Sequence, residues 1–285
     1  MKNEKSKFLV PQCLSALAPF KKSAFTLAEV LITLAIIGVV AAMTIPTLIA
    51  NYQEKQTVTA LRKFQTNMTQ AYLRATVDHG YAIQWEENNS QTLTNQERCH
   101  KMFEKFRPYL KIAKDCGSRS GCFGEGNYKK IDGTETSKSW DYTGANWYKV
   151  ILSDGMSVLF YSRGPVFSQL GNTTEHGTFI VDINGKNGPN MMGKDTFTFF
   201  LTNNGVVPDG NPSNGYQYKL KDDEGNYIVD YNGEYVTTTD TLLDCNRTKC
   251  LQDCEACTAW VIENGNMDYL HCDDLSWNGK RKCSE

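Results

Sequence analysis

The sequence lacks the motifs of the common enzyme classes. It contains no His-Glu-x-x-His of a metalloprotease and no Gly-x-Ser-x-Gly of a hydrolase, and its 4 histidines are isolated from one another. The segment "GPNMMGKD" comes nearest to a phosphate-binding loop. Asp195, however, stands where a Ser or Thr hydroxyl would meet magnesium, and the following "TFTFF" is typical of a strand instead of a helix. We therefore expect that the protein is not an enzyme.

Proline and an excess of either charge are also scarce. With 8 prolines and 22 glycines in 285 residues, the chain is neither collagen-like nor of low complexity. A formal net charge of −2 gives no indication of nucleic-acid binding, so nucleic acid is not an expected partner. Hydrophobic residues at 40% and charged residues at 22% are typical of a folded chain, and the length allows one or two domains.

Only one long hydrophobic run is present. From Val30 through Gln53 no residue is charged, a run of 24 positions, and a membrane-spanning helix needs about 20 predominantly apolar residues. The preceding leader carries five lysines and one acidic residue, Glu4. Such flanking lysines keep their end of the chain in the cytoplasm. The sequence predicts a transmembrane span at about 28–50 and an exported C-terminal part, and removal of residues 1–24 changes the net charge from −2 to −6.

A helical period continues beyond the apolar run. Gly80 supplies a stop signal, so we expect one long N-terminal helix over 25–78. Pro46 removes a backbone donor within it, which predicts a kink. Apolar residues at spacings of three and four predict a stripe that packs on a core: Val58, Leu61, Phe64, Met68, Ala71, Tyr72 and Ala75.

After Gly80 the pattern changes to short strands and tight turns. Asn-Gly or Asp-Gly steps with strand-like runs beside them occur at 154–155, 184–185, 204–205, 232–233 and 264–265. These steps tolerate the backbone angles of hairpins, which indicates antiparallel pairing. The expected fold class is α+β: a long kinked N-terminal helix, membrane-embedded in its first half, packed on an antiparallel β-rich, disulfide-stapled head over 79–285.

Ten cysteines indicate an oxidising compartment, and nine of them follow residue 24. If Asn264-Gly265 forms a two-residue hairpin, Cys257 and Cys272 lie directly opposite each other and are candidates for a disulfide. Because nine is odd, at least one thiol stays free or pairs outside the chain. The spacing of four cysteines leaves a zinc site open as an alternative: Cys245, Cys250, Cys254 and Cys257.

One acidic residue lies in the apolar region. A carboxylate such as Glu29 costs about 2.5 kcal/mol or more at mid-membrane, less near the edge, and is normally paired. A cut between Ala24 and Phe25 would create an amino group at nearly the same membrane depth, and Glu29 of a neighbouring copy could pair with it. This pairing would make Glu29 an assembly residue. The alternative is that Glu29 lies in the headgroup layer without a role.

The segment "KKSAFTLAEVLITLAIIGVVAAMTIPTLI" resembles the N-terminus of type IV prepilins and type II secretion pseudopilins. The resemblance implies a leader peptide over 1–24, cleavage by prepilin peptidase between Ala24 and Phe25, and methylation of the new N-terminus at Phe25. Ala24 stands where the family usually has glycine, and a small residue still fits a tight peptidase site. The resemblance also identifies Glu29 with the family glutamate and Pro46 with the kink proline.

What the resemblance implies is a structural subunit of a filament. The chain would be a single-pass protein of the bacterial inner membrane with an exported head, and would then enter a periplasmic or extracellular type IV pilus-like filament or type II secretion pseudopilus. Expected partners are prepilin peptidase, identical or related pilin subunits, the assembly platform and membrane lipid. Two alternatives remain: a minor pilin or membrane-tethered adhesive or ligand-binding module, and a secreted enzyme with a general signal peptide, which Glu29 opposes.

A glycine-rich loop gathers oxygen-bearing side chains around Asp182, Asn184 and Asp195. Such ligands could hold calcium, although the glycine is not where a helix-loop-helix calcium site requires it. A tight turn with side-chain caps is the alternative. The heads of some pseudopilins bind calcium in a loop, so the resemblance supports calcium as the one candidate cofactor, with Asp182, Asn184 and Asp195 as candidate ligands.

Overall fold

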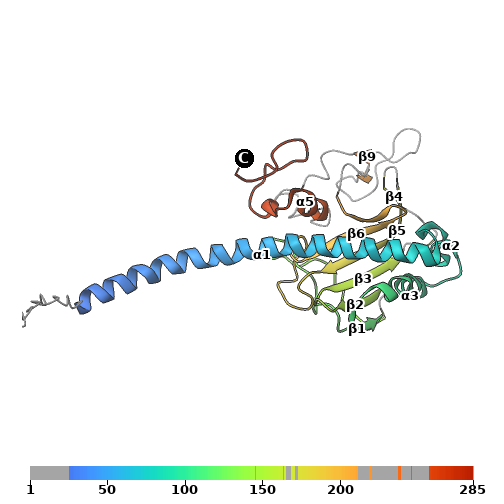
Figure 1. Cartoon of the computed structure of the whole chain (residues 1–285), viewed down its shortest axis with the longest axis horizontal. Coiled ribbons are helices and arrows are strands. Elements are labelled where there is room, and N and C mark those ends of the chain that lie inside the picture. Colours follow the sequence, from blue (N-terminus) through green and yellow to red (C-terminus); the bar gives the residue numbers. More distant parts are fainter. Residues whose placement is uncertain are drawn as a thin grey trace, which may run out of the picture. The chain divides into compact units, whose positions relative to one another are not determined.

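The computed structural model describes residues 26–144, 146–162, 164, 168–170, 173–210, 218–219, 237–238, 245 and 257–284. The chain divides into two compact units, Met1–Ile49 and Ala50–Glu285. We call the helical residues Leu27–Ile49 of the first unit the stem, and the second unit the head unit. One helix, α1 (Leu27–His79), contributes to both units and is the long blue-to-cyan ribbon of Figure 1.

The extent and the buried face of α1 agree with the sequence prediction. The helix ends before Gly80, whose φ of 74° is a left-handed conformation that glycine adopts without a steric penalty. Pro46 lies inside the helix and does not end it; the kink stays a prediction. The buried side chains include every predicted member of the stripe: Val58, Leu61, Phe64, Met68, Ala71, Tyr72 and Ala75.

One antiparallel sheet forms the centre of the head unit, which confirms the α+β fold class. Its strands follow the order β1-β2-β3-β5-β6-β7, with β4 paired to β5. The second half of α1 lies across one face of this sheet (Figure 1), where the rings of Phe64 and Phe199 are 5.1 Å apart. The strands are β1 (Ile112–Gly117), β2 (Tyr148–Leu152), β3 (Ser157–Ser162), β4 (Ser168–Leu170), β5 (Thr173–Asp182), β6 (Thr196–Thr202) and β7 (Gly205–Pro208). A separate pair consists of β8 (Tyr218–Lys219) and β9 (Thr237–Thr238).

Two of the predicted turns join neighbouring strands. Asp154-Gly155 connects β2 to β3 as a tight hairpin, and Gly155 has a φ of 92°. At 204–205 the turn also joins paired strands, with Gly205 already opposite Thr202 in the β6–β7 register. The step at 184–185 instead opens a longer loop between β5 and β6. The step at 232–233 lies outside the described residues.

Short helices between α1 and β1 cover the same face of the sheet as α1. They are η1 (Ala82–Gln84), α2 (Glu86–Asn89), α3 (Asn95–Phe106) and η2 (Arg107–Tyr109). A capping box starts α3, because the Thr94 hydroxyl accepts from the Glu97 N–H at 3.3 Å while the Glu97 carboxylate accepts from the Thr94 N–H at 2.8 Å. The Phe106 ring lies 6.4 Å from Tyr72 and 5.4 Å from Phe179, which ties α1, α3 and β5 into one aromatic core.

The predicted hairpin at Asn264-Gly265 is wrong. Residues Cys257–Asn264 form helix α5, and Gly265 ends it with a φ of 66° and an N–H that donates to the carbonyl of Val261 at 3.1 Å. A 3₁₀ turn, η4 (Asp268–Leu270), follows. The alternating sequence around Trp260 fits a strand as well as a helix. In the structure, residues 257–261 are all buried, so this helix is packed into the core.

The predicted disulfide between Cys257 and Cys272 is therefore wrong as well. Without a hairpin the two residues do not face each other; Cys257 instead pairs with Cys245, and Cys272 pairs with Cys283. The bond from Cys245 to Cys257 also removes two of the four thiols that a zinc site would need.

Among the described residues, Cys99 is the cysteine that forms no disulfide. It is buried and free, and burial raises the pKa of its thiol to about 11. A third disulfide joins Cys116 to Cys122. Cys250 and Cys254 lie outside the described residues. Disulfides thus close loops at both the β1 end and the C-terminal end of the head unit.

Candidate functional site

The stem begins with a capping box that holds Glu29. The backbone N–H and the hydroxyl of Thr26 both donate to Oε2 of Glu29, at 2.8 and 3.0 Å, and the Glu29 N–H donates to the Thr26 hydroxyl at 3.2 Å. The other carboxylate oxygen, Oε1, makes no hydrogen bond with any described residue. Sequence reasoning missed Thr26, although the spacing Thr-x-x-Glu is the signature of such a box. Ala24 and Phe25 lie outside the described residues.

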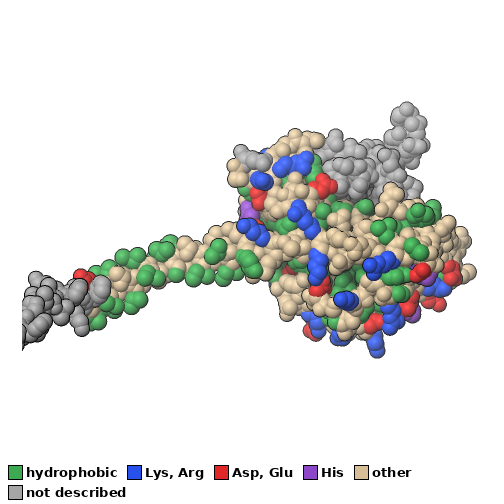
Figure 2. Space-filling view, viewed as in Figure 1, with side chains coloured by type: hydrophobic (Ala, Val, Ile, Leu, Met, Phe, Trp, Pro, Cys, Tyr) green, Lys and Arg blue, Asp and Glu red, His purple; other side chains and the backbone are tan. Residues whose placement is uncertain are grey.

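Apolar side chains cover the stem and are exposed. Their exposed fractions run from 41% at Val30 to 77% at Leu27 (Figure 2, green). Within the described part of the chain, α1 is the one helix long and apolar enough to cross a membrane. Gly38 has open space where a side chain would be. A surface of this kind requires lipid or another apolar helix around it.

The predicted calcium ligands come together where β5 ends and β6 begins. Asp182 is the last residue of β5, and Asp195 directly precedes β6. Asn184 donates its side-chain N–H to Asp195 at 3.4 Å. Asp195 also accepts from the backbone N–H groups of Asn190, at 2.9 Å, and Met191, at 2.5 Å. The loop between the strands therefore folds around the Asp195 carboxylate.

Burial raises the pKa of both carboxyl groups. The pKa of Asp182 is raised to about 8, chiefly by burial and then by the negative charge of Asp195. The pKa of Asp195 is raised to about 6, again by burial. The Tyr128 hydroxyl donates to Asp182 at 2.7 Å, a partner that sequence reasoning missed because it lies far away in the chain. At neutral pH this pair of acids retains a proton unless a cation compensates its charge.

Three buried oxygens beside these acids have no hydrogen-bond partner: Asn184 Oδ1, Asn190 Oδ1 and Thr196 Oγ1. Thr196 is only 5% exposed, and it stands opposite Asp182 in the β5–β6 register, so the two side chains share one face of the sheet. Buried polar atoms without partners are uncommon and point to a missing ion or water. No group of three or more His, Cys, Asp or Glu that could hold a metal occurs in the described ranges. The oxygens present here are of the kind that calcium prefers.

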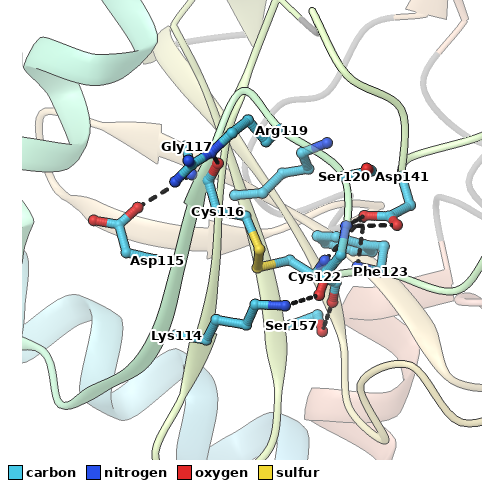
Figure 3. The surroundings of a disulfide bond; sticks show 12 residues. Lys114, Asp115, Cys116, Gly117, Arg119, Ser120, Cys122, Phe123, Asp141 and Ser157 are labelled. Atoms are coloured by element: carbon cyan, nitrogen blue, oxygen red, sulfur yellow. Dashed lines mark hydrogen bonds between the residues drawn. A yellow bond between two sulfur atoms is a disulfide. The ribbon is translucent and has the colours of Figure 1, made fainter.

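A disulfide-closed loop precedes Tyr128, and its backbone amides donate to a half-buried carboxylate, that of Asp141. Cys116 and Cys122 close the loop directly after β1 (Figure 3). The Asp141 carboxylate accepts from the N–H groups of residues 121–123 at 2.8 to 3.0 Å, and Figure 3 shows it beside this end of the loop. Several amide donors to one carboxylate make a strong local clamp. The clamp fixes the start of the segment that contains Tyr128, whose hydroxyl donates to Asp182.

Comparison with known proteins gives two matches, both confined to the N-terminal half of the chain. Residues 19–45 match the prokaryotic N-terminal methylation motif. Residues 47–121 match a family of unknown function (DUF6613). No curated protein and no solved structure matches the chain.

The methylation motif supports a prepilin-type signal at residues 19–45. It covers Ala24, Phe25 and Glu29, the positions that the sequence singles out for cleavage, methylation and assembly. Together with the apolar first half of α1, the motif supports a pilin-like precursor that is processed by prepilin peptidase and anchored in the membrane with an exported head.

Proposed function

We propose that the chain is a structural filament subunit. Prepilin peptidase cuts it between Ala24 and Phe25, methylates Phe25, and the mature protein polymerises into a type IV pilus-like filament or a type II secretion pseudopilus. The observation that carries this proposal is the stem: a helix with exposed apolar side chains whose one acid, Glu29, lies within the matched motif. Assembly replaces lipid around the stem with the stems of other subunits.

In this proposal Glu29 pairs with the Phe25 amino group of a neighbouring subunit. The capping box engages one carboxylate oxygen, Oε2, and leaves Oε1 for an intermolecular partner. Thr26 also fixes the side-chain conformation of Glu29, so less conformational entropy is lost when the pair forms. We therefore assign Thr26 a positioning role. A charge pair is strengthened in lipid because little water competes for it, and this effect grows with depth from the membrane edge.

The test is mass spectrometry of the N-terminus of the mature protein. A chain that starts at a methylated Phe25 supports the proposal. A chain that keeps residues 1–24, or starts at another residue, contradicts it. The same measurement on an Ala24→Gly variant provides a control, because glycine restores the residue usual in the family and should be processed at least as fast.

We also propose that the head unit binds calcium at the acidic loop. Asp182 and Asp195 would supply charge, with neutral oxygens from Asn184, Asn190 and Thr196. The unpartnered buried oxygens support this proposal, because a hard cation such as calcium prefers oxygen ligands of this kind. The alternative from the sequence, a turn held by side-chain caps, accounts for the contacts of Asp195 but not for those oxygens.

Thermal unfolding of the full-length protein in detergent tests the calcium site. At a calcium concentration 100 times its Kd, stabilisation is about 2.7 kcal/mol, which raises the Tm by about 5 °C or more. Asp182→Asn should remove this gain, and Glu104→Gln, an exposed acid on α3, should keep it. Equal Tm values in calcium and in chelator would show that the loop is held by its own hydrogen bonds.

A second candidate function is a ligand-binding or adhesive head, as in a minor pilin. One cavity favours it, about 350 Å³ in volume, with Trp140 and Trp147 on its wall at a ring distance of 5.7 Å. Trp140 Nε1 is buried and has no hydrogen-bond partner. Copy number in sheared filaments separates the two functions, since a major subunit is abundant there and a tip subunit contributes a few copies.

A further inference from the structure

A second cavity lies beside the first turn of α1 in the head unit. It has a volume of about 220 Å³, and Ala50 and Glu54 of α1 form one wall. The opposite wall comes from the C-terminal segment, where Nε2 of His271 lies 2.8 Å from Oε1 of Glu54. This contact brings the region after η4 against the first head-unit turns of α1. Its lining also includes Met191 and Lys194, which belong to the loop with the proposed calcium ligands.

The position of the cavity along α1 sets its depth relative to a membrane. Glu54 is the first charged residue after the uncharged run that ends at Gln53. With a rise of 1.5 Å per residue, Ala50 and Glu54 are about 6 Å apart along the helix axis. The headgroup layer on each side of a bilayer is about 5–7 Å thick. If the uncharged run spans the membrane as proposed, the first charged residue after it, Glu54, lies in the headgroup layer.

Charges of both signs line this cavity. Glu54 and Asp132 carry negative charge, and the Asp132 carboxylate is kept ionised because the hydroxyl and N–H of Thr134 donate to it and lower its pKa. Lys194 carries positive charge, is exposed, and has no ion-pair or hydrogen-bond partner for its side chain among the described residues. His271 is a further nitrogen-bearing side chain of the lining, and its Nε2 lies 2.8 Å from Oε1 of Glu54.

The remaining wall of the cavity is apolar. Ala50, Ile131, Met191 and Leu270 complete its lining. The last three are half-buried, and Ala50 is exposed. An apolar wall next to paired opposite charges is unlike a metal site, which requires converging oxygens, and unlike an anion site, which two carboxylates would repel. The lining suits a ligand that carries both charges and an apolar tail.

We propose that this cavity binds the headgroup of an aminophospholipid. The phosphate faces Lys194 and His271, the primary ammonium faces Glu54 and Asp132, and the start of the acyl chains contacts the apolar wall. A primary ammonium donates hydrogen bonds to carboxylates, whereas a quaternary ammonium has none to donate. The site therefore prefers phosphatidylethanolamine to phosphatidylcholine. This inference rests on the membrane anchoring of the proposed function, and not on filament assembly.

Native mass spectrometry of the full-length protein in detergent tests the proposal. The protein is mixed with equal amounts of phosphatidylethanolamine, phosphatidylcholine and phosphatidylglycerol. We expect one retained phosphatidylethanolamine, at least fivefold more abundant than either competitor. The double variant Glu54→Gln with Asp132→Asn should abolish the preference over phosphatidylcholine, and Lys194→Gln should lower retention of all three lipids.

Lys111→Gln is the matched control, because Lys111 lines a different groove, together with Arg74 of α1. Arg74 lies 20 residues after Glu54, which is about 30 Å along the helix axis. The control variant should leave lipid retention unchanged. Thermal unfolding of each variant identifies any that fail to fold. If the double variant fails to fold, lipid retention by Lys194→Gln, a substitution at an exposed position, tests the site instead. Equal retention of the three lipids by the wild type, or a preference that survives all variants, would overturn the proposal.

The N-terminal measurement on the same sample separates this inference from the proposed function. A protein that starts at methylated Phe25 but retains no preferred lipid refutes the lipid site alone. A chain that is not cut at Ala24 and does not sediment with membranes refutes the proposed function instead.

Discussion

The two parts of α1 differ both in apolar content and in surroundings. In the stem, Leu34 is 60% exposed and Ile37 is 63% exposed. In the head unit, Leu61 and Phe64 on the same helix are at most 1% exposed, because they pack on the sheet. Charged residues separate the two parts in sequence: none occurs from Val30 to Gln53, and they recur from Glu54 onward.

This comparison shows that the apolar side chains of one continuous helix can depend on two different environments for their stabilisation. The second half obtains its stability from within the chain, by burying a stripe of apolar side chains on the sheet. In the part of the chain that the structure describes, the large apolar side chains of the stem stay exposed, so we expect its free energy to depend on lipid or on other subunits. Substitutions in the stem should therefore change membrane insertion and assembly, whereas substitutions in the second half should change folding.

The largest effect is expected from the acid of the stem. Glu29→Ala should leave membrane insertion and cleavage intact and abolish filament formation, because the Phe25 amino group of the neighbour would lose its partner in lipid. Glu29→Gln should also abolish assembly, since an amide carries no charge. The measurement is the amount of subunit in sheared filaments, with N-terminal mass spectrometry on the membrane fraction.

Glu104→Ala serves as the matched control for Glu29, because it removes an exposed acid from the head unit. It should assemble at the wild-type level. Thr26→Val should give an intermediate yield, since the carboxylate remains but loses the hydrogen bond from the Thr26 hydroxyl, and the Glu29 N–H loses its acceptor. Normal filament yield from Glu29→Ala would contradict the pairing and remove the functional difference between the two halves of α1.

The next largest effect is expected when one apolar side chain is truncated to alanine in each half of α1. Phe64→Ala should destabilise the head unit by about 3–5 kcal/mol, because it leaves a cavity opposite Phe199. Leu34→Ala should not change the stability of the head unit at all. Tryptophan fluorescence during denaturant unfolding of the full-length protein measures this, since every tryptophan follows residue 79. A comparable loss from Leu34→Ala would show that the stem packs within its own chain.

Sequence reasoning predicted α1 and its buried stripe because a helical period repeated over many turns is a strong local signal. It failed at α5 because eight residues such as "CTAWVIEN" fit a strand as well as a helix. The burial of Trp260 and the disulfide from Cys257 to Cys245 settle that choice, and both depend on contacts that are distant in sequence.

The candidate sites divide in the same way. Asp182, Asn184 and Asp195 lie within one loop, so the sequence alone brings them into consideration. Tyr128 contacts Asp182 only because of the way the disulfide-closed segment folds, and no local sequence pattern predicts this contact. The aminophospholipid cavity joins residues 50–54 to residue 271, which no periodicity connects.

A third prediction concerns pH, to which the two parts should respond differently. With divalent cations removed, the head unit should lose stability as the pH rises from about 4 to about 8. The folded pKa values of Asp182 and Asp195, about 8 and about 6, exceed the unfolded value of 3.8, so the folded state binds more protons in this window. Between pH 6 and pH 8 the expected loss is on the order of 2 kcal/mol.

Denaturant unfolding at fixed pH values measures this loss. Asp182→Asn should flatten the pH profile, because it keeps the buried site neutral throughout. A profile that rises with pH in chelator would mean that these carboxyl groups are ionised in the folded protein without a cation. Glu29 is the one ionisable side chain of the stem, so Glu29→Gln should leave the slope measured for the head unit unchanged.

The smallest effect compares single glycines in the two parts. Gly265→Ala should destabilise the head unit by about 1 kcal/mol or slightly more, because its φ is 66° and an added methyl would lie 2.8 Å from the Arg62 guanidinium. Arg62 donates to the carbonyl of Ile262 at 2.8 Å and so holds the end of α5 on α1. Gly126→Ala, with a φ of 81° and open space around it, isolates the backbone part of that cost.

Gly38→Ala provides the stem counterpart, since nothing lies within 4 Å of its added methyl. In the isolated subunit it should cost nothing, and alanine should even favour the helix by up to about 1 kcal/mol. Any penalty from Gly38→Ala can then arise only when stems pack against each other, so it should appear in filament yield and not in unfolding of the monomer. A loss of monomer stability from this substitution would mean that the stem has a partner within its own chain.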